Sequence, residues 1–454
     1  MHDIIIIGGG PAGSTAATLL ARQGYKTLVL EKAKFPREHV GESLLPFCYP
    51  ILEELGVLPQ MQKGYVRKPG ATFSSIDGKD ETHYCFGKVI EGPEYLSFHI
   101  HRARFDHMLL ENSRNNGVEV LEEMTVRKVD FESLSDGAVV HVDDKEGRAH
   151  TFPSRFVIDA SGQDSLLANQ METRVPFDQL HRRVAYSTHW KNAKLNDSLQ
   201  AGNINIVHLE GEKLGWIWMI PVTEDRLSVG LAVNMSYAKA QKKASPVKRS
   251  EFKEWFYLKE IQSSPLVAEI IEGAERANPV AVNGDFSYYS TRKFGDRFAL
   301  IGDASGFIDP IFSSGIYLSM KSAQLLAESL PKWLEQSDKL PMKEVYDSIN
   351  GAYELVEKMV TTFYDPNSIR FEDVHKLQVY DYEKFIAGMS IWHLVLAGDF
   401  FTNYKKYIKA VGLLNNDRKI DQFKKLAGYE QDESANVICV ARNVQQQLSS
   451  NASR

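Results

Sequence analysis

The chain begins with an apolar run, a glycine cluster and a helical run, and a second apolar run follows. Residues 3–7 are rich in isoleucine, and residues 14–25 contain good helix formers that end at Gly24. Residues 26–32 (KTLVLEK) then have the composition of a buried strand. Two buried strands joined by a helix predict a β-α-β unit, the start of a parallel sheet with crossover helices.

The pattern changes around residues 84–101 and again at 200–235. Residues 226–234 (RLSVGLAVN) carry apolar side chains at every second position, and residues 222–226 (VTEDR) predict a turn before them. Together with residues 215–221 (GWIWMIP) they predict an antiparallel hairpin of a second sheet. Side chains alternate between the faces of a strand, so Trp216 and Trp218 should share one face. Core packing is the ordinary explanation for two such aromatic residues.

Two later segments, 154–162 (SRFVIDASG) and 296–306 (DRFALIGDASG), have the pattern of strands that return to the first sheet. From about residue 316 onward, helical periodicity dominates. We therefore predict an α/β fold with a doubly wound, Rossmann-type lobe, an inserted lobe built on an antiparallel sheet, and a helical C-terminal region. The expected boundaries are 1–75, 102–180 and 280–330 for the first lobe, 76–101 and 181–279 for the second, 331–445 for the helical region, and 446–454 for a frayed tail.

Composition narrows the classes of protein that fit this pattern. The chain has 454 residues, of which 43% are hydrophobic, so it can bury a large core in two or three lobes. A net charge of -6 without a dense basic stripe argues against nucleic-acid binding. No apolar run reaches the length of a membrane span, and the N-terminus lacks the basic segment of a signal peptide. These features predict a cytoplasmic protein.

The spacing of the cysteines and histidines predicts neither disulfide bonds nor a metal-binding site. Cys48, Cys85 and Cys439 are widely spaced and odd in number, which we interpret as neither a disulfide framework nor a zinc site. This usage is consistent with a reducing cytoplasm. None of the 13 histidines has the spacing of metal ligands, so no metal is expected.

The glycine cluster predicts a dinucleotide site. Gly8, Gly10 and Gly13 form a G-x-G-x-x-G pattern between the first strand and the helix. Such glycines permit a tight turn and a close approach of the backbone to a pyrophosphate, whose charge the helix N-terminus stabilises. Glu31 ends the second strand at the position that binds ribose hydroxyls.

Three further segments resemble the FAD monooxygenase-like superfamily: 296–306 (DRFALIGDASG), 159–162 (DASG) and 101–106 (HRARFD). The resemblance implies that the ligand is FAD, with Asp303 facing its ribityl and pyrophosphate region and Arg102 in contact with the flavin. A second G-x-G-x-x-G is not apparent, so reduced flavin should come from a separate NAD(P)H-dependent reductase. The expected FAD-binding residues are Gly8, Gly10, Ala12, Gly13, Glu31, Lys32, Arg102 and Asp303.

Two motifs narrow the resemblance to the flavin-dependent halogenases. Residues 216–221 (WIWMIP) match the W-x-W-x-I-P motif of this family, and residues 306–316 (GFIDPIFSSGI) match F-x-x-P-x-x-S-x-G. Residues 35–46 (FPREHVGESLLP) also resemble the family, and the similarity extends over residues 1 to about 330. The resemblance implies that reduced flavin, oxygen and a halide give hypohalous acid, which travels through a tunnel to a lysine. Trp216 and Trp218 would keep organic substrate away from the flavin.

The resemblance also assigns the lysine and the halide site. The family's lysine lies in a segment that resembles K-x-G-A-x-F, and residues 68–73 (KPGATF) therefore indicate Lys68. A desolvated lysine has a pKa lowered toward neutral pH. Lys79 is the alternative, but it follows a turn signal (IDG) and is expected on the surface. Ser314 and Gly315 would bind chloride or bromide, and Ser313 would connect the flavin side with the lysine side.

One position departs from the tryptophan halogenases, which carry a glutamate directly before their S-T-G. Phe312 occupies this position here, as in halogenases of phenols and pyrroles. These electron-rich substrates need less help from a carboxylate, so free tryptophan is a disfavoured substrate. The substrate is expected to be a small aromatic compound, free or bound to an acyl or peptidyl carrier protein.

Several alternatives stay open. A basic run of Lys239, Lys242, Lys243, Lys248, Arg249 and Lys253 is either a docking site for an acidic carrier protein or a solvated helix face. The aromatic-rich C-terminal helices either cover the substrate pocket or pack on one another. A flavin-dependent hydroxylase, a geranylgeranyl-reductase-like enzyme and an inactive flavin-binding module would all fit the same scaffold.

Overall fold

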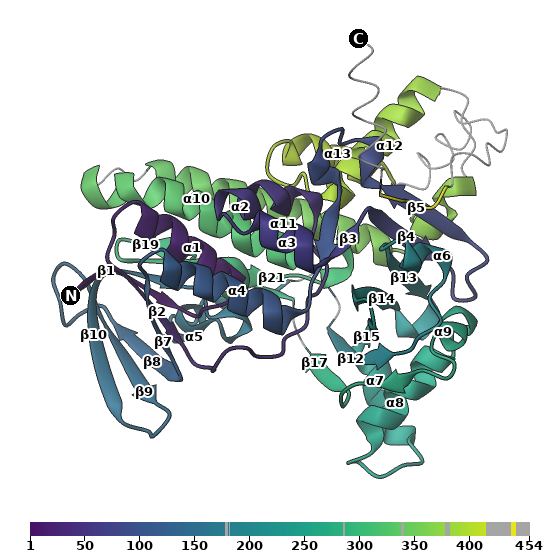
Figure 1. Cartoon of the computed structure of the whole chain (residues 1–454), viewed down its shortest axis with the longest axis horizontal. Helices are drawn as coiled ribbons and strands as arrows, with labels where there is room; N and C mark the ends of the chain where they lie inside the picture. The colour runs from purple at the N-terminus through teal and green to yellow at the C-terminus, as the bar shows by residue number, and fades with distance from the viewer. Residues whose placement is uncertain are drawn as a thin grey trace.

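The computed structural model describes residues 1–177, 180, 182–284, 287–336, 340–376, 382–414 and 437–441. Figure 1 shows two bodies side by side, with the N-terminal sheet at the left and the second sheet at the right. The predicted tail at 446–454 lies outside the described residues, as does part of the predicted helical region.

The first sheet is a parallel sheet extended by antiparallel strands. β1 (His2–Ile7) pairs in parallel with β2 (Thr27–Glu31) and β10 (Ala149–Asp159), and helix α1 (Pro11–Arg22) connects β1 with β2. The outer strands are β7 (Glu119–Glu122), β8 (Met124–Asp130), β9 (Ala138–Asp144), β19 (Phe294–Gly295) and β20 (Phe298–Leu300). β20 pairs with β10, so the chain does return to the first sheet as predicted.

The second sheet contains the predicted hairpin. β14 (Gly215–Thr223) and β15 (Arg226–Asn234) pair antiparallel at its centre. Its other strands are β16 (Glu275–Arg276), β12 (Arg183–Lys191), β17 (Ala281–Gly284), β13 (Ile204–Leu209), β4 (Gly70–Ser74) and β5 (Glu81–Cys85). The predicted boundary at residue 75 assigns β4 to the first lobe, but β4 pairs with β13 in this sheet.

Two short ribbons lie between the sheets. β3 (Val66–Lys68) pairs with β6 (Ser97–His99), and β18 (Tyr288–Ser290) pairs with β11 (Arg174–Pro176) and β21 (Gly306–Phe307). Their pairing brings residues 66–68 and 306–307 to the junction of the two bodies, where the segments that carry the predicted site also lie (Figure 1).

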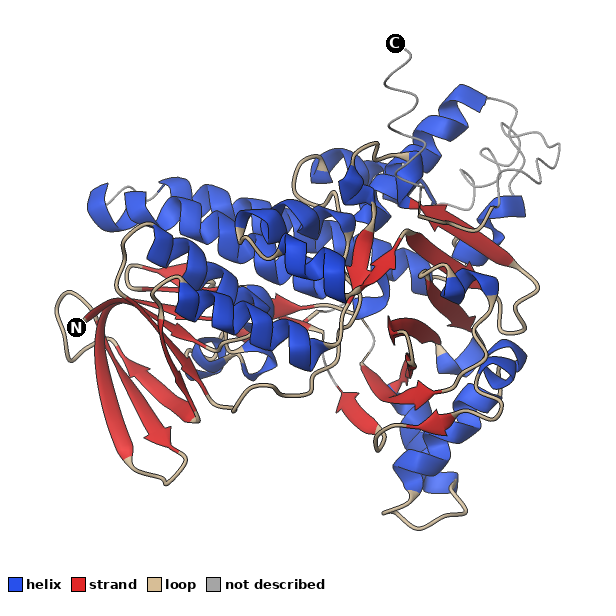
Figure 2. Cartoon of the chain, viewed as in Figure 1, coloured by secondary structure: helices blue, strands red, loops and turns tan. Residues whose placement is uncertain are grey.

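Helices cover both sheets (Figure 2). α10 packs on α1, α11 packs on α10, and α13 packs on α11. The long helices are α4 (Arg102–Asn115), α7 (Met235–Ala244), α8 (Phe252–Gln262), α10 (Gly315–Gln336), α11 (Leu340–Tyr364), α12 (Tyr382–Ala397) and α13 (Tyr404–Leu414). The short ones are α2 (Tyr49–Glu54), α3 (Leu58–Gly64), α5 (Leu166–Gln170), α6 (Asp197–Gln200) and α9 (Pro265–Ile270). None of the described helices has the length and apolar character needed to cross a bilayer.

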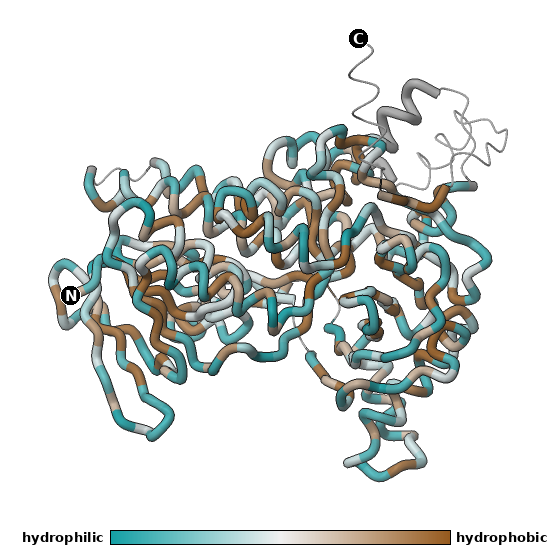
Figure 3. The backbone as a smooth tube through the Cα atoms, in the orientation of Figure 1, coloured by the Kyte–Doolittle hydropathy of each residue, from teal (hydrophilic) through white to brown (hydrophobic). Residues whose placement is uncertain are grey.

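The two faces of the second sheet belong to different cores. Trp216, Trp218 and Ile220 pack in the large core that also contains α1, α10 and α11. Ile217 and Met219 point the other way, into a core formed with α7, α8 and α9. Figure 3 shows hydrophobic stretches in both bodies. The predicted α/β fold class and the shared face of the two tryptophans are therefore confirmed.

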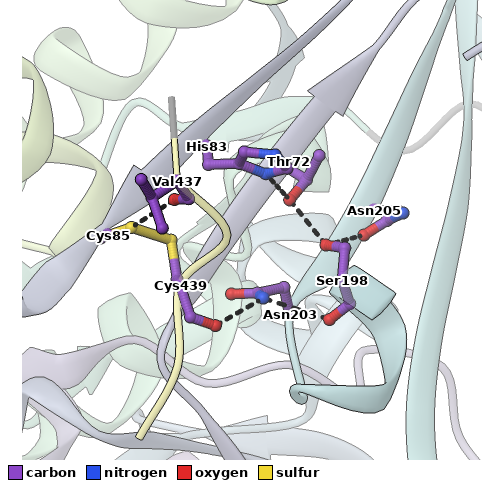
Figure 4. The surroundings of a disulfide bond; sticks show 8 residues. All are labelled: Thr72, His83, Cys85, Ser198, Asn203, Asn205, Val437 and Cys439. Atoms are coloured by element: carbon purple, nitrogen blue, oxygen red, sulfur yellow. Dashed lines mark hydrogen bonds between the residues drawn. A yellow bond between two sulfur atoms is a disulfide. The ribbon is translucent and has the colours of Figure 1, made fainter. Parts of the chain in front are cut away.

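The prediction that the cysteines form no disulfide is wrong. Cys85, at the end of β5, forms a disulfide with Cys439, which is 354 residues away in the sequence. Figure 4 shows the C-terminal segment beside β5, where the Cys439 carbonyl accepts a hydrogen bond of 2.9 Å from Asn203. Sequence separation hides such a pair, because only the path of the folded chain brings the two thiols together. Cys48 is free and buried.

Candidate active site

A cavity of about 510 Å³ lies between the first sheet and the tryptophan face of the second sheet. The β1–α1 turn forms one end of it. A Cβ atom at Gly8 would lie 2.4 Å from the Ala160 oxygen, and one at Gly13 would lie 1.9 Å from the Gly8 oxygen. A side chain at either position would therefore collide with backbone, so the turn requires both glycines. Gly10 and Ala12 line the cavity itself.

The N-terminus of α1 opens onto this cavity. Gly10 is the N-cap residue and provides no capping side chain, while Pro11 occupies the first turn. The first N–H groups of a helix have no partner within the helix, and they attract anions. The turn therefore fits the pyrophosphate of a dinucleotide such as FAD, as the sequence predicts.

Glu31 lies at the end of β2 and lines the same cavity. Its carboxylate accepts hydrogen bonds from the Gly9 N–H at 2.7 Å and from the Ala33 N–H at 2.8 Å. These bonds fix the carboxylate, and its oxygens have further lone pairs that can accept ribose hydroxyls. Lys32 also lines the cavity, but its ammonium forms an ion pair with Asp164.

Arg102 lies at the start of α4 and contacts the loop formed by residues 37–43. Its guanidinium donates two hydrogen bonds of 2.8 Å to the carboxylate of Asp106, and Nη1 donates to the Val40 carbonyl at 2.9 Å. Arg37 also donates to Asp106, at 2.9 Å. Arg102 thus holds residues 37–43 along the cavity, and it lines the cavity as well.

The loop 37–43 contains cavity residues that the sequence analysis did not single out. Arg37, His39, Glu42 and Ser43 line the cavity, and the charge of Arg102 together with burial lowers the pKa of His39 to about 4. Glu42 Oε1 lies 2.6 Å from Nε2 of His189 on β12. The loop residues belong to the segment 35–46 (FPREHVGESLLP), which resembles the family. No local pattern in the sequence predicted which of them would line the cavity.

Asp303 faces the cavity from the end of β20. Burial raises the pKa of its carboxyl to about 6, against the opposing effects of Arg102 and of a 3.3 Å hydrogen bond from Ser319 Oγ. Asp303 and Ser319 both line the cavity. Seven of the eight predicted FAD residues therefore line one continuous space. The eighth, Gly13, does not line it and packs against the Gly8 carbonyl within the β1–α1 turn.

Trp216 and Trp218 line the cavity from β14. Their ring centroids lie 5.1 Å apart, and both side chains are buried. Trp218 Nε1 donates to Ser228 Oγ at 3.3 Å on the neighbouring strand. Two fixed aromatic rings at this point can block a bulky organic molecule.

The segment of Ser313, Ser314 and Gly315 lies beside this wall, between a 3₁₀ turn (Pro310–Phe312) and α10. Ser313 has a left-handed backbone conformation (φ +55°), which is uncommon for serine and concentrates at functional sites. Ser313 and Gly315 line the cavity, whereas Ser314 is fully buried behind it and its Oγ has no hydrogen-bond partner among the described residues. The free N–H groups of the first turn of α10 fit a small anion such as a halide.

A buried polar group that sequence reasoning missed supports this loop. Asp309 caps the 3₁₀ turn through the Ile311 N–H at 3.2 Å, and it accepts a 2.9 Å hydrogen bond from the Tyr364 hydroxyl on α11. Arg183 of β12 lies 3.6 Å from the same carboxylate. The Asp-Pro pair could have indicated the cap, but no sequence signal indicated its partners on β12 and α11.

Lys68 lies at the end of β3, behind the loop 37–43. Its side chain is 1% exposed, and Nζ donates to the Leu44 carbonyl at 3.1 Å. Leu44 directly follows Ser43, which lines the cavity. Burial lowers the pKa of the Lys68 ammonium from 10.5 to about 7. Lys79 instead has an 82% exposed side chain and pairs with Asp77, 2.9 Å away in a turn.

The remaining sequence features are distributed around this site. Phe312 packs against Phe73 and Phe371, and the helix α12 contacts β5 near them. The basic run lies on α7, α8 and the loop between them, which cover the sheet face opposite to the tryptophans. Within the described residues, we find no group of three or more His, Cys, Asp or Glu side chains that could hold a metal ion.

The sequence resembles characterised halogenases. The family model described as tryptophan halogenase matches residues 3–99 and 87–373. The tryptophan 2-halogenase of Chondromyces crocatus is 33% identical over 80% of this chain and 68% of its own length. The 1H-pyrrole-2-carbonyl-[peptidyl-carrier protein] chlorinase of Pseudomonas fluorescens is 32% identical over 74% of this chain and 77% of its own.

Solved structures share the fold over nearly the whole chain. A flavoprotein/dehydrogenase from Cytophaga hutchinsonii has a TM-score of 0.79 at 26% identity and covers 94% of this chain and 98% of its own. The flavin-dependent brominase Bmp2 has a TM-score of 0.77 at 26% identity and covers 93% of this chain and 99% of its own.

Proposed function

Because this chain belongs to the family of flavin-dependent halogenases that the tryptophan halogenase model describes, we propose that it halogenates an electron-rich aromatic compound, a phenol or a pyrrole. It uses reduced FAD, oxygen and chloride or bromide. The observation that carries this proposal is Lys68: a buried lysine with a pKa near 7, one hydrogen bond from the segment that lines the flavin cavity.

The roles of the cavity residues follow from their contacts. FAD, when bound, supplies hypohalous acid from oxygen and halide. The glycine turn and the α1 N-terminus bind the pyrophosphate, Glu31 binds the ribose, and Asp303 and the Arg102-held loop face the flavin. Gly315 and Ser314 hold the halide through backbone N–H groups, next to Ser313. A separate flavin reductase provides the reduced flavin.

In this proposal the two tryptophans separate the flavin from the aromatic substrate, and Lys68 lies on the substrate's side of them. Trp216 and Trp218 exclude the aromatic substrate from the flavin side, so only a small species passes. Lys68 then holds the hypohalous acid for the substrate. An amine in a dry site that loses its proton near neutral pH can donate a hydrogen bond to the acid or form a bond with its electrophilic halogen.

Phe312 supports a phenol or pyrrole substrate, because these electron-rich rings need less help than tryptophan from a carboxylate at this position of the halide loop. The relative from Pseudomonas fluorescens acts on a carrier-bound pyrrole, which supports the carrier-bound form of substrate for this chain as well. The basic run lies on the opposite face of the sheet, which favours a solvated surface over a carrier-docking site at the reaction chamber. We also propose a cytoplasmic location, although the Cys85–Cys439 disulfide does not support it, because such bonds are rare in a reducing cytoplasm. Reduced thiols at both positions in fresh cell extracts would support this location, and an oxidised pair would contradict it.

Mass spectrometry of turnover mixtures tests the proposal. The mixtures contain FAD, a flavin reductase, NADH and air, with phenols or a pyrrolyl thioester, and with chloride, bromide or no halide. We expect products with a halogen isotope pattern. Lys68→Met should lower their yield about 100-fold or more, whereas Lys79→Met, the matched exposed control, should behave as wild type.

A halide-independent gain of one oxygen would instead support the flavin-dependent hydroxylase. Saturation of an alkene without oxygen would support the reductase-like alternative.

A further inference from the structure

A histidine–carboxylate pair, with Glu372 buried and His208 part-buried, lies on the tryptophan side of the second sheet. His208 Nδ1 and Glu372 Oε1 are 3.0 Å apart. His208 is the cross-strand partner of Trp216. Glu372 belongs to a 3₁₀ helix (Phe371–Lys376) that packs on β4 and β5, where Thr82 Oγ1 donates to the Glu372 carbonyl at 2.8 Å.

The alternation of side chains along β13 places His208 on the same face of the second sheet as the two tryptophans. Ile204, Ile206 and His208 alternate with Asn205 and Val207 along the strand. Ile204 lines the flavin cavity, and Ile206 belongs to the same core as the tryptophans. Side chains two residues apart share a face, so His208 lies on the tryptophan side.

Aromatic rings connect this pair with the halide loop. His208 lies 4.8 Å from the Phe363 ring, and Phe371, which precedes Glu372, lies 5.5 Å from the ring of Phe312. Phe312 directly precedes Ser313. The pair and the halide loop therefore border one aromatic cluster.

The same cluster extends to Lys68. Phe371 lies 6.2 Å from the ring of Tyr84, whose hydroxyl donates to the Phe371 carbonyl at 3.0 Å. Phe86 follows two residues after Tyr84, and its ring lies 5.4 Å from Lys68 Nζ. Lys68 therefore borders one part of the core that holds this cluster, and Glu372 borders another.

One oxygen of Glu372 has no donor. The residue is 2% exposed, and Oε2 has no hydrogen-bond partner among the described residues. A buried carboxylate oxygen without a donor is unfavourable, so such an atom indicates a missing ligand that donates a hydrogen bond. A phenol O–H or a pyrrole N–H is a donor of this kind.

We propose that Glu372, held in place by His208, accepts the O–H or N–H proton of the aromatic substrate and so supplies the carboxylate that Phe312 removes from the halide loop. This inference rests on the proposed function. Glu372 is the catalytic residue in this step, because it touches the substrate, and His208 is a positioning residue.

For a phenol, the step balances as follows. The O–H bond breaks, its proton goes to Glu372 Oε2, and the electron pair stays on the substrate. The activated ring carbon attacks the halogen of the hypohalous acid at Lys68, so a carbon–halogen bond forms and the oxygen–halogen bond breaks. The released hydroxide takes the proton of that ring carbon and leaves as water, and Glu372 returns its proton to the product oxygen.

The test uses a series of substituted phenols of increasing acidity with wild type, Glu372→Gln and His208→Asn. We expect Glu372→Gln to halogenate weakly acidic phenols at least about 10-fold more slowly than wild type, and already ionised phenols at nearly the wild-type rate. His208→Asn should show the same trend with a smaller loss. Glu210→Gln, a nearby 56% exposed carboxylate paired with Arg370, is the matched control and should follow wild type.

The ratio of rates between two phenols does not depend on how much enzyme is folded, so a partly unstable variant still gives an answer. An equal loss for all phenols, no loss at all, or a wild type that halogenates none of them overturns the inference. Hypohalous acid trapped by a small scavenger is measured in parallel. If wild type forms none, the proposed function itself fails; if it does, only the role of Glu372 is in question.

Discussion

The indole ring of Trp218 occupies the space that a side chain at Gly230 would fill. The two residues are partners across β14 and β15, and a Cβ atom at Gly230 would lie 1.9 Å from Cζ2 of the indole. Ala232 pairs with Trp216 in the same way, and Ser228 pairs with Ile220. Small residues at alternate positions of β15 therefore make room for the aromatic wall.

Gly230→Ala should displace the Trp218 ring and lower the free energy of unfolding by about 1–3 kcal/mol, because the core has no space for the added methyl group. Denaturant unfolding measures this loss. In a Trp218→Ala background the same substitution should cost little, because the clash is gone. Equal costs in both backgrounds would contradict the contact.

The buried Lys68 should make stability depend on pH. In the unfolded chain its amine keeps a proton up to about pH 10.5, whereas in the folded protein the pKa is about 7. The unfolded state therefore binds more protons between these values, so this group's contribution to stability rises with pH across that range.

Lys68→Met should consequently be more stable than wild type by several kcal/mol at pH 7, and this difference should shrink toward zero near pH 10.5. Unfolding curves at several pH values check this trend. Lys63→Met, at an exposed site on α3, is the control and should differ from wild type by a constant amount. A pH-independent gain in Lys68→Met would show that the amine is not desolvated.

Glu31→Gln should weaken FAD binding about 10-fold or more. The carboxylate accepts two backbone N–H groups, and in our proposal it also accepts a ribose hydroxyl of FAD. Hydrogen bonds to a charged group contribute about 1.5–3 kcal/mol. Quenching of flavin fluorescence measures the affinity. Glu119→Gln, at the opposite end of the neighbouring strand β7, should bind FAD as wild type does. An unchanged affinity in Glu31→Gln would remove Glu31 from the site.

Reduction of the Cys85–Cys439 disulfide should lower the melting temperature and expose the segment 437–441 to proteases. The two cysteines are 354 residues apart, and for a loop of this length the chain-entropy model gives a stabilisation of about 6 kcal/mol. Melting curves with and without dithiothreitol measure the effect, and the reductant should not change Cys85→Ser further. Alkylation of both thiols in the native, unreduced protein would contradict the bond.

The local units of this protein are encoded in short stretches of its chain. The glycine turn between β1 and α1, the acid at the end of β2, and the hairpin with both tryptophans on one face are recognisable because their geometry depends on a few neighbouring residues. The small residues at 228, 230 and 232 were also readable, as the other half of the alternation in β15. The order of the motifs indicated the halogenase family, whereas the α/β fold class was predicted from the pattern of strands and helices.

The surroundings of individual side chains, in contrast, depend on how distant parts of the chain pack together. A motif indicated Lys68, but its pKa is lowered because β3, the loop 37–43 and Phe86 surround its side chain and bury it. Cys85 meets Cys439, and His208 meets Glu372, across separations of 354 and 164 residues. Burial and long-range contact depend on how distant elements pack, and a linear pattern does not encode which strand edge a returning segment will meet.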